Sequence, residues 1–246
     1  LFGSHWVIKQ SKVLVISDRE RAVHTAMRSL EENRGLLEEY IHHNPSFKHG
    51  LSPMRVNEGA PTIVKLASEA AAKTGVGPMA AVPGALADLA VQSMKSCGGK
   101  ANVVENGGEI SGCSAVPIII GIYAGLASVS GRIGFKLLRG DFPIGIGTSS
   151  ASVGHALSFG EADAAVVVAD SASLADAAAT AVCNAVRGDG VEASINRGLE
   201  VAEQLPIRSA LIIRGAYVGT IGKLPKLLKL EGETSELFEN VYPPAL

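Results

Sequence analysis

The segment ADAAATAV, residues 175–182, carries one carboxylate, Asp176, and one hydroxyl, Thr180, in an otherwise small and apolar stretch. Its alanine content predicts a helix, and residues four positions apart share one face of a helix. A carboxylate and a hydroxyl on one face suit a hard cation such as magnesium, whose other ligands would be a backbone carbonyl, water and substrate phosphate. The alternative is that Asp176, three residues after Ser173, stabilises the start of its own helix through the macrodipole.

Glycines gather where the expected elements join, in GVGPMAAVPG, ENGGEISG and FPIGIGTSSASVGH. Such glycines let backbone N–H groups approach a ligand closely, and a helix N-terminus beside them attracts anions such as pyrophosphate. None of these segments matches the P-loop pattern GxxxxGK followed by Ser or Thr, and Gly75 and Gly77 do not continue into GxGxxG. The two common nucleotide-binding loops are therefore excluded, and ordinary tight turns are the alternative for each segment.

The segment TSSASVGH brings four polar side chains together, namely Thr148, Ser149, Ser150 and His155. A serine nucleophile would require the elbow GxSxG, and the second glycine of that pattern is missing after Ser149. We expect instead that the hydroxyls and backbone amides hold a phosphate, and that His155 is a hydrogen-bond donor or a general acid/base. A histidine that only completes a hydrogen bond in the core is the alternative.

The composition of the 246 residues excludes several classes of function. The formal net charge is −2 and no long run of lysine or arginine occurs, which argues against nucleic acid as the partner. The most apolar run, residues 116–126, contains glycines and is shorter than the roughly 20 residues of a membrane-spanning helix, so it predicts a buried strand. Cys97, Cys113 and Cys183 lack CxxC spacing, and no secretory signal is visible, so we expect a cytoplasmic protein.

Periodicity divides the chain into two similar passages, each with strands, two helices and further strands. The first is expected to contain helices at 18–43 and up to about residue 94, and strands at 5–8, 12–17, 101–105 and 116–123. The second is expected to contain helices at 173–186 and 191–204, and strands at 133–138, 144–147, 164–169, 210–214 and 217–221. This order predicts an α+β fold, a duplicated two-layer unit in which helices pack on one face of an antiparallel sheet. We expect one domain, 1–246, with an internal pseudo-repeat of about 1–125 and 130–222.

Four segments together resemble the ApbE superfamily of FAD-dependent FMN transferases. NVVENGGEI resembles its N-A-G-G-D strand and turn, and ADAAATAV resembles its A-D-A-x-A-T-A helix. TSSASVGHALSFG and VGPMAAVPGALAD occupy the places of its T-S-G and A-K-G segments. The chain is more similar still to an uncharacterised branch of bacteria and archaea, whose members contain VGPMAAVAGA, VENGGDI, TSSGTVGHSLSFG and ADAAAT.

This resemblance implies a fold similar to a duplicated T-fold and a binding site for FAD and magnesium. ApbE-type enzymes cleave the pyrophosphate of FAD with the help of magnesium and place FMN on a threonine of a target protein. Carried over, the metal ligands are Asp176, Thr180 and the carbonyl near Ala80, and His155 and Asp176 are the catalytic candidates. Contacts with the flavin nucleotide fall on Asn106, Gly107, Gly108, Thr148, Ser149 and Ser150.

The departures from the superfamily pattern bear on the reaction. Ala81 stands where the A-K-G segment has lysine, Ser158 stands where an acid or amide often follows the histidine, and the N-terminal flavin motif has no counterpart. We expect a protein that binds FAD with magnesium and transfers FMN to a protein or hydrolyses the pyrophosphate. The alternative is a non-enzymatic accessory protein of redox or sulfur metabolism that binds flavin or another anionic ligand. The expected partners are the flavin nucleotide or another small molecule similar to pyrophosphate, and a protein acceptor. Nucleic acid and membrane are not expected as partners, and the chain could form a homo-oligomer.

Overall fold

The centre of the molecule is one antiparallel sheet of eight strands. The computed structural model describes residues 1–9, 11–125, 127, 130–151 and 159–230. The strand order in the sheet is β1-β2-β3-β4-β7-β8-β9-β10, and every neighbouring pair is antiparallel. The strands are β1 (Phe2–Ile8), β2 (Ser11–Ser17), β3 (Ala101–Asn106), β4 (Glu109–Ser114), β7 (Ile144–Ser149), β8 (Ala164–Ala169), β9 (Ser209–Arg214) and β10 (Tyr217–Gly222).

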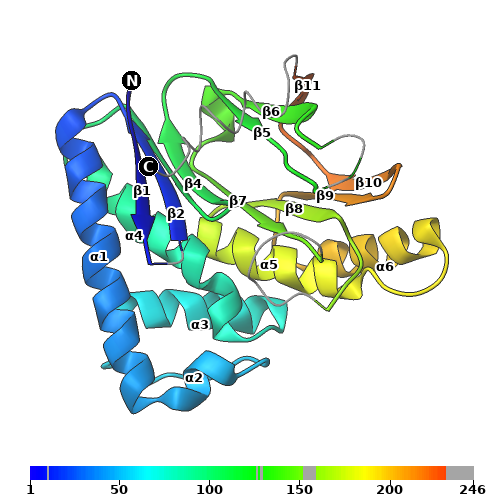
Figure 1. Cartoon of the computed structure of the whole chain (residues 1–246), viewed down its shortest axis with the longest axis horizontal. Coiled ribbons are helices and arrows are strands. Elements are labelled where there is room, and N and C mark those ends of the chain that lie inside the picture. The colour runs from blue at the N-terminus through cyan, green and yellow to red at the C-terminus, as the bar shows by residue number, and fades with distance from the viewer. Residues whose placement is uncertain (10, 126, 128–129, 152–158, 231–246) are drawn as a thin grey trace.

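Helices cover one face of this sheet (Figure 1). They are α1 (Glu20–His43), the short α2 (Pro45–His49), α3 (Thr62–Thr74), α4 (Val82–Lys95), α5 (Ala172–Ala185) and α6 (Val191–Gln204). The helices α4, α5 and α6 pack on strands of this sheet, whereas α3 packs on α4 and α5. The buried apolar stripe of α1, which includes Met27, Leu30 and Leu37, packs mainly with α4 and also reaches β1 and β2. The predicted α+β class, with helices on one face of an antiparallel sheet, is confirmed.

A second sheet of three strands covers part of the opposite face. Its order is β11 (Lys226–Lys229), β6 (Ile133–Leu137) and β5 (Ile118–Gly121). Phe135 and Leu137 of β6 are fully buried and pack with Ile144, Val166 and other residues of the central strands. The fold therefore has three layers here, because the apolar residues on this face of the large sheet also need cover.

The expectation that residues 116–126 form a buried strand is wrong. Of the described residues in this run, only Ile118–Gly121 are in a strand, and alternate residues of that strand face solvent, so Ile119 is 58% exposed. Val116 precedes the strand and is 44% exposed. The run belongs to the small covering sheet, which has one buried face and one exposed face. A short apolar run does not distinguish such a strand from one in the centre of the main sheet.

Each half of the chain contributes four strands to the large sheet. The first half supplies β1 and β2, then helices, then β3 and β4, and the second half supplies β7 and β8, then α5 and α6, then β9 and β10. The fourth strand of the first half is Glu109–Ser114, which the sequence analysis missed, and the predicted strand at 133–138 joins the small sheet. The halves meet where β4 pairs with β7, with Ile110 opposite Ile146.

No single helix of the described residues is long and apolar enough to cross a membrane. Only α3 taken together with the segment Pro78–Lys95 reaches the necessary length and composition, and those two parts are bent by 105° against each other. Much of both is buried in the core beneath the sheet, with Ala67, Ala71, Ala87 and Ala90 inaccessible to solvent.

Candidate functional site

The N-terminal ends of α4 and α5 touch, and Asp176 joins them. The Oδ2 atom of Asp176 accepts a hydrogen bond from the backbone N–H of Gly84, at 2.9 Å, in the first turn of α4. The start of α5 itself is capped by Ser171, whose hydroxyl accepts from the N–H of Leu174. Asp176 therefore occupies a free N–H of the neighbouring helix and does not cap its own.

Asp88 makes the reciprocal connection, from α4 to the start of α5. Its Oδ1 accepts from the N–H of Ala172 and its Oδ2 from the N–H of Ser173, each at 2.9 Å. The hydroxyl of Ser111 on β4 donates to the same Oδ1 at 2.8 Å. Each of the two helices thus has N–H groups of its first turn satisfied by a carboxylate of the other helix, a geometry that fixes Asp176 relative to α4.

Glycines allow α5 to lie directly on β7. A Cβ atom added to Gly147 would lie 2.5 Å from the backbone nitrogen of Asp176, closer than real Cβ contacts come. A Cβ on Gly84 would lie 2.8 Å from the backbone nitrogen of Ser173. The glycines of FPIGIGTSS in the strand therefore serve close packing of backbone on backbone, and they set the depth at which Asp176 is buried.

The turn between β3 and β4 brings Asn106 to the start of α4. Gly107 and Gly108 have φ values of 75° and 115°, which favour glycine and make this short turn. The Nδ2 atom of Asn106 donates to the carbonyl of Pro83 at 3.0 Å, next to the Gly84 that Asp176 binds. The Oδ1 atom of Asn106 is buried and has no hydrogen-bond partner among the described residues. An unpartnered buried amide oxygen is costly, so it marks a position where a ligand donor or water would be stabilised.

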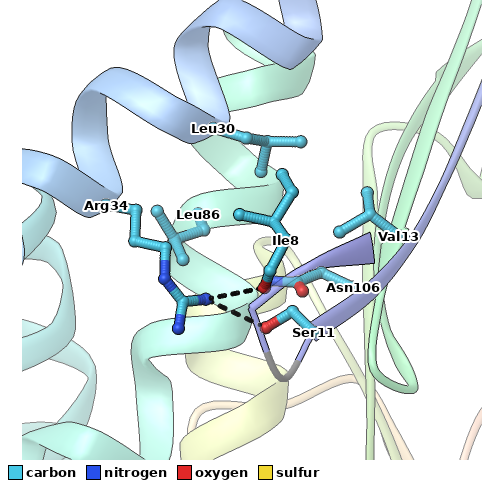
Figure 2. Close-up of a pocket in the computed structure, with 7 residues that line it drawn as sticks. All are labelled: Ile8, Ser11, Val13, Leu30, Arg34, Leu86 and Asn106. Atoms are coloured by element: carbon cyan, nitrogen blue, oxygen red, sulfur yellow. Dashed lines mark hydrogen bonds between the residues drawn. The ribbon is translucent and has the colours of Figure 1, made fainter. Parts of the chain in front are cut away.

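Asn106 also borders a small cavity between α1 and the β1–β2 hairpin (Figure 2). The cavity has a volume of about 10 Å³, close to the least that a water molecule needs. The Arg34 guanidinium lies on its wall, where it donates to the hydroxyl of Ser11 at 3.2 Å and pairs with Glu38. Because its volume is close to that of a single water molecule, this cavity is suited to water and is too small for a phosphate group.

Glu109 is a second buried carboxylate of the site. Burial raises its pKa well above the ordinary value, and the charges of Asp176 and Glu105 raise it further, against a backbone hydrogen bond from Thr148. Burial likewise raises the pKa of Asp176, with a contribution from the charge of Asp88, against the hydrogen bond from Gly84. The two carboxyl groups thus repel one another in a dry environment, and a nearby cation would relieve both costs.

Several of the predicted site residues come together here. Asp176 and Asn106 meet at the start of α4, and Ala80 lies in the 3-10 helix Pro78–Ala81, which precedes α4 and contacts α5. Thr180 follows Asp176 by one turn of α5 and is half-buried. Thr148 reaches the site through its backbone bond to Glu109.

Other predicted residues are less closely tied to this cluster. Ser149 is buried at the end of β7, Ser150 follows it, and His155 lies outside the described residues. The described part of the chain contains no group of three or more His, Cys, Asp or Glu side chains arranged to hold a metal ion. A metal near Asp176 would therefore depend on hydroxyl and carbonyl oxygens, as the predicted set does.

The sequence analysis missed Glu109 and Asp88 as members of the site. A signal for Glu109 existed, because it stands where the N-A-G-G-D pattern has its acid. Asp88 gave no local signal, since its partners Ser111, Ala172 and Ser173 come from two other elements.

Comparisons with known proteins agree with this architecture. A family model described as "AbpE bacteria" matches residues 3–218. A UPF0280 protein of Methanococcus vannielii is 41% identical over 245 residues, which cover 98% of each chain. The ApbE protein of Thermotoga maritima has a similar structure, with a TM-score of 0.55 at 14% identity over 97% of this chain and 99% of that one. The flavinyl transferase ApbE of Pseudomonas stutzeri, in its apo form, gives a TM-score of 0.53 at 13% identity over 100% and 98%. At such identities the two structures establish the shared fold.

Proposed function

The chain belongs to the ApbE-related family that the "AbpE bacteria" model describes, and from this membership we propose that it binds FAD together with a magnesium ion. The observation that carries the proposal is the buried cluster at the start of α4. There, Asp176 and Glu109 both have a raised pKa, and the Oδ1 atom of Asn106 has no partner among the described residues. Such a cluster is costly unless it serves a ligand.

The residues present fit a hard cation. Asp176 and Thr180 on α5 and the carbonyl near Ala80 supply oxygen atoms, the ligand type that magnesium prefers. A bound magnesium ion would neutralise the charge on the phosphate oxygens. The raised pKa of the Asp176 carboxyl supports this role, because a divalent cation beside it would favour the ionised form.

The polar groups around this centre are proposed to hold the nucleotide. The amide of Asn106 and the backbone N–H of Gly108, at the β3–β4 turn, would contact the pyrophosphate or ribityl chain. Gly107 would lie beside the nucleotide without donating to it, because its N–H already donates to the carbonyl of Lys12 at 3.0 Å. Thr148, Ser149 and Ser150 are proposed to contribute from the end of β7, and His155 to give or take a proton at a reacting oxygen. The FAD pyrophosphate bond would then break at the FMN phosphorus, with AMP as the leaving group and either a protein threonine hydroxyl or water as the nucleophile.

A binding-only function is the second candidate. Ala81 is fully buried and apolar at the position where the related enzymes carry lysine. The described cluster at the start of α4 therefore combines carboxylates with backbone N–H groups, and no lysine of the A-K-G type faces the phosphates. Under this alternative the protein would bind a flavin or another anionic ligand and present it to a redox partner, without catalysing a reaction. The cytoplasmic location and the protein acceptor expected from the sequence belong to these proposals as well.

Calorimetry tests the proposal. The purified protein is titrated with FAD in the presence of magnesium and in the presence of a chelator, and Asp176→Ala is compared with Lys73→Ala, an exposed position on α3. We expect binding that requires magnesium and that only Asp176→Ala abolishes. If intact protein shows no binding with both FAD and magnesium present, the proposal is wrong. Chromatography of AMP and FMN after incubation then separates the enzyme from the binding protein.

A further inference from the structure

The small sheet gathers positive charge that is scattered along the sequence. Strands β6 and β11 lie side by side although about ninety residues separate them, and they form one outer layer with β5 (Figure 1). The stretches of sequence that contain these strands, residues 116–142 and 223–230, have a single acid, Asp141, and the cations Arg132, Lys136, Arg139, Lys223, Lys226 and Lys229. The chain as a whole has a net charge of −2, so this layer is a local exception.

Strand register shows which side chains face outward. Phe135 and Leu137 are buried against the large sheet, so Lys136 points away from it, since alternate residues of a strand face opposite sides. Lys226 of β11 stands directly opposite Lys136, and Ile119 of β5 stands opposite Lys136 on the other side. The outer face is therefore a row of two lysines and an exposed isoleucine.

This arrangement is unfavourable in the isolated chain. Like charges directly opposite each other on neighbouring strands destabilise a sheet. The ion pairs of the described residues lie elsewhere, on Lys9, Arg34, Arg208 and Arg214. Asp141 is engaged by the N–H of Leu138, to which its Oδ2 atom is bonded at 2.6 Å. Nothing in the described part of the chain therefore balances the two lysines.

Exposed aliphatic residues lie around the same lysines. Ile119 is 58% exposed and Leu138, two residues after Lys136, is 45% exposed. Leu227 is exposed as well, but it stands opposite Phe135 and so belongs to the other face of the small sheet. Lysines interspersed with exposed aliphatic side chains fit the apolar centre and charged rim of a protein interface. A nucleic acid would use a longer basic track with aromatic side chains for stacking, and the described outer face of this sheet has neither.

We propose that the outer face of the β5–β6–β11 sheet is a docking surface for an acidic polypeptide segment with apolar side chains. The charge of such a segment would complement Lys136 and Lys226, and its apolar side chains would cover Ile119 and Leu138. The surface lies across the large sheet from Asp176 and Asn106, and it depends on none of the residues proposed to bind FAD. Peptide docking at this surface is therefore independent of FAD binding, and failure of one proposal would not contradict the other.

The test uses the intact chain and a fluorescein-labelled peptide of glutamate, leucine and phenylalanine, followed by fluorescence anisotropy. A peptide with glutamine in place of glutamate is the control for charge. We expect binding of the acidic peptide that weakens as salt is added, because the charges are exposed to solvent. Lys136→Glu with Lys226→Glu is expected to reduce the affinity by about tenfold or more. The same net change at exposed helix positions, Lys73→Glu with Lys95→Glu, is expected to leave it within about threefold.

The single variant Lys136→Glu shows whether a loss of peptide affinity comes from unfolding of the chain. It replaces the Lys–Lys pair by a Glu–Lys pair, so its melting temperature should be equal to or above that of the parent while its peptide affinity falls. Equal affinity of the sheet and helix variants would overturn the proposal.

Two further outcomes would also overturn it. One is binding of phosphatidylserine vesicles without binding of the peptide. The other is that the peptide binds only to a shortened chain that ends at Leu230. Residues 231–246 contain glutamates and no lysine or arginine, so that result would mean that this segment itself occupies the face.

Discussion

At the scale of single residues, the two buried carboxylates Asp176 and Glu109 determine how the site responds to pH. Burial raises both pKa values in the folded protein above those in the unfolded chain, and neighbouring carboxylates raise them further, Asp176 acting on Glu109 and Asp88 on Asp176. The folded state therefore binds protons more readily, and stability is greatest below the unfolded pKa of about 4 and is lost as pH rises through the folded pKa. We predict that the free energy of unfolding without metal falls as pH rises above about 4, and that Glu109→Gln reduces this fall.

Urea unfolding of the parent protein and of Glu109→Gln, between about pH 4 and pH 8, measures how the free energy of unfolding changes with pH. A chelator removes magnesium from both samples. Glu58→Gln, an exposed carboxylate for comparison, should follow the parent curve. Parallel curves for the parent and Glu109→Gln would show that Glu109 does not titrate in the way its burial implies.

The residues of this cluster differ in how far the sequence could predict them. Asp176 and Asn106 stand in segments whose residue types and order resemble a known pattern, so both were predicted. Glu109 stands in such a segment as well, but its burial beside Asp176 is visible only in the fold. The role of Asp88 depends on contacts between α4, α5 and β4 that arise only in the folded chain. Gly145 and Gly147 were expected to bring backbone N–H groups near a ligand, and in the structure a helix lies on them.

At the scale of elements, the contact between the starts of α4 and α5 depends on Asp88. Its carboxylate accepts from two N–H groups of α5 and from Ser111, and removing it leaves three donors without their partner. We predict that Asp88→Ala lowers the free energy of unfolding by about 3 kcal/mol, since bonds to a charged group are worth more than neutral ones. Urea denaturation measures this. Ser171→Ala, which removes the cap at Leu174 and a hydroxyl–hydroxyl bond with Ser173, should cost about 1 kcal/mol. An equal loss for both variants would contradict the role of Asp88.

The packing of α5 on β7 is the second prediction for the elements. A methyl group at position 147 would overlap the backbone of α5 near Asp176, and backbone cannot move aside as a flexible side chain can. Gly147→Ala is therefore expected to lower stability by about 3 kcal/mol. Gly140→Ala is the matched control, because nothing lies within 4 Å of its added Cβ. A melting temperature of Gly147→Ala equal to that of this control would mean that α5 is not held against β7 as described.

The strands show that periodicity predicts where a strand lies but not which strand it pairs with. The hairpin at 210–221 and the strand at 164–169 were predicted closely. The strand at 164–169 is a short apolar run that is buried at every position. The segment 133–138 was also predicted as a strand, but its place in the covering sheet follows from pairing with β11, far along the sequence. Periodicity describes the exposure of a strand's faces and carries no information about which partner it pairs with.

At the scale of the whole molecule, the two halves are joined through the middle of the large sheet and by the two helices. Residues Ile110 to Gly112 of β4 pair with Ile144 to Ile146 of β7, and Asp88 and Asp176 bond across the same boundary. A boundary crossed by backbone pairing and buried hydrogen bonds does not resemble the exposed linkers between domains. We therefore predict that the chain is one domain and that both halves unfold in a single transition.

Two probes placed in opposite halves test this directly. Trp6 of β1 is the single tryptophan, so its fluorescence follows the first half, and the thiol of Cys183, fully buried on α5, follows the second. In a variant with Cys97→Ser and Cys113→Ser, labelling of Cys183 by a thiol reagent reports the opening of α5 alone. The two probes should give the same urea midpoint, because unfolding of the first half removes β4, the partner of β7, together with Asp88, which binds the N–H groups of Ala172 and Ser173 at the start of α5. Midpoints that differ by more than about 0.5 M urea would show instead that the repeat units are separate folding units.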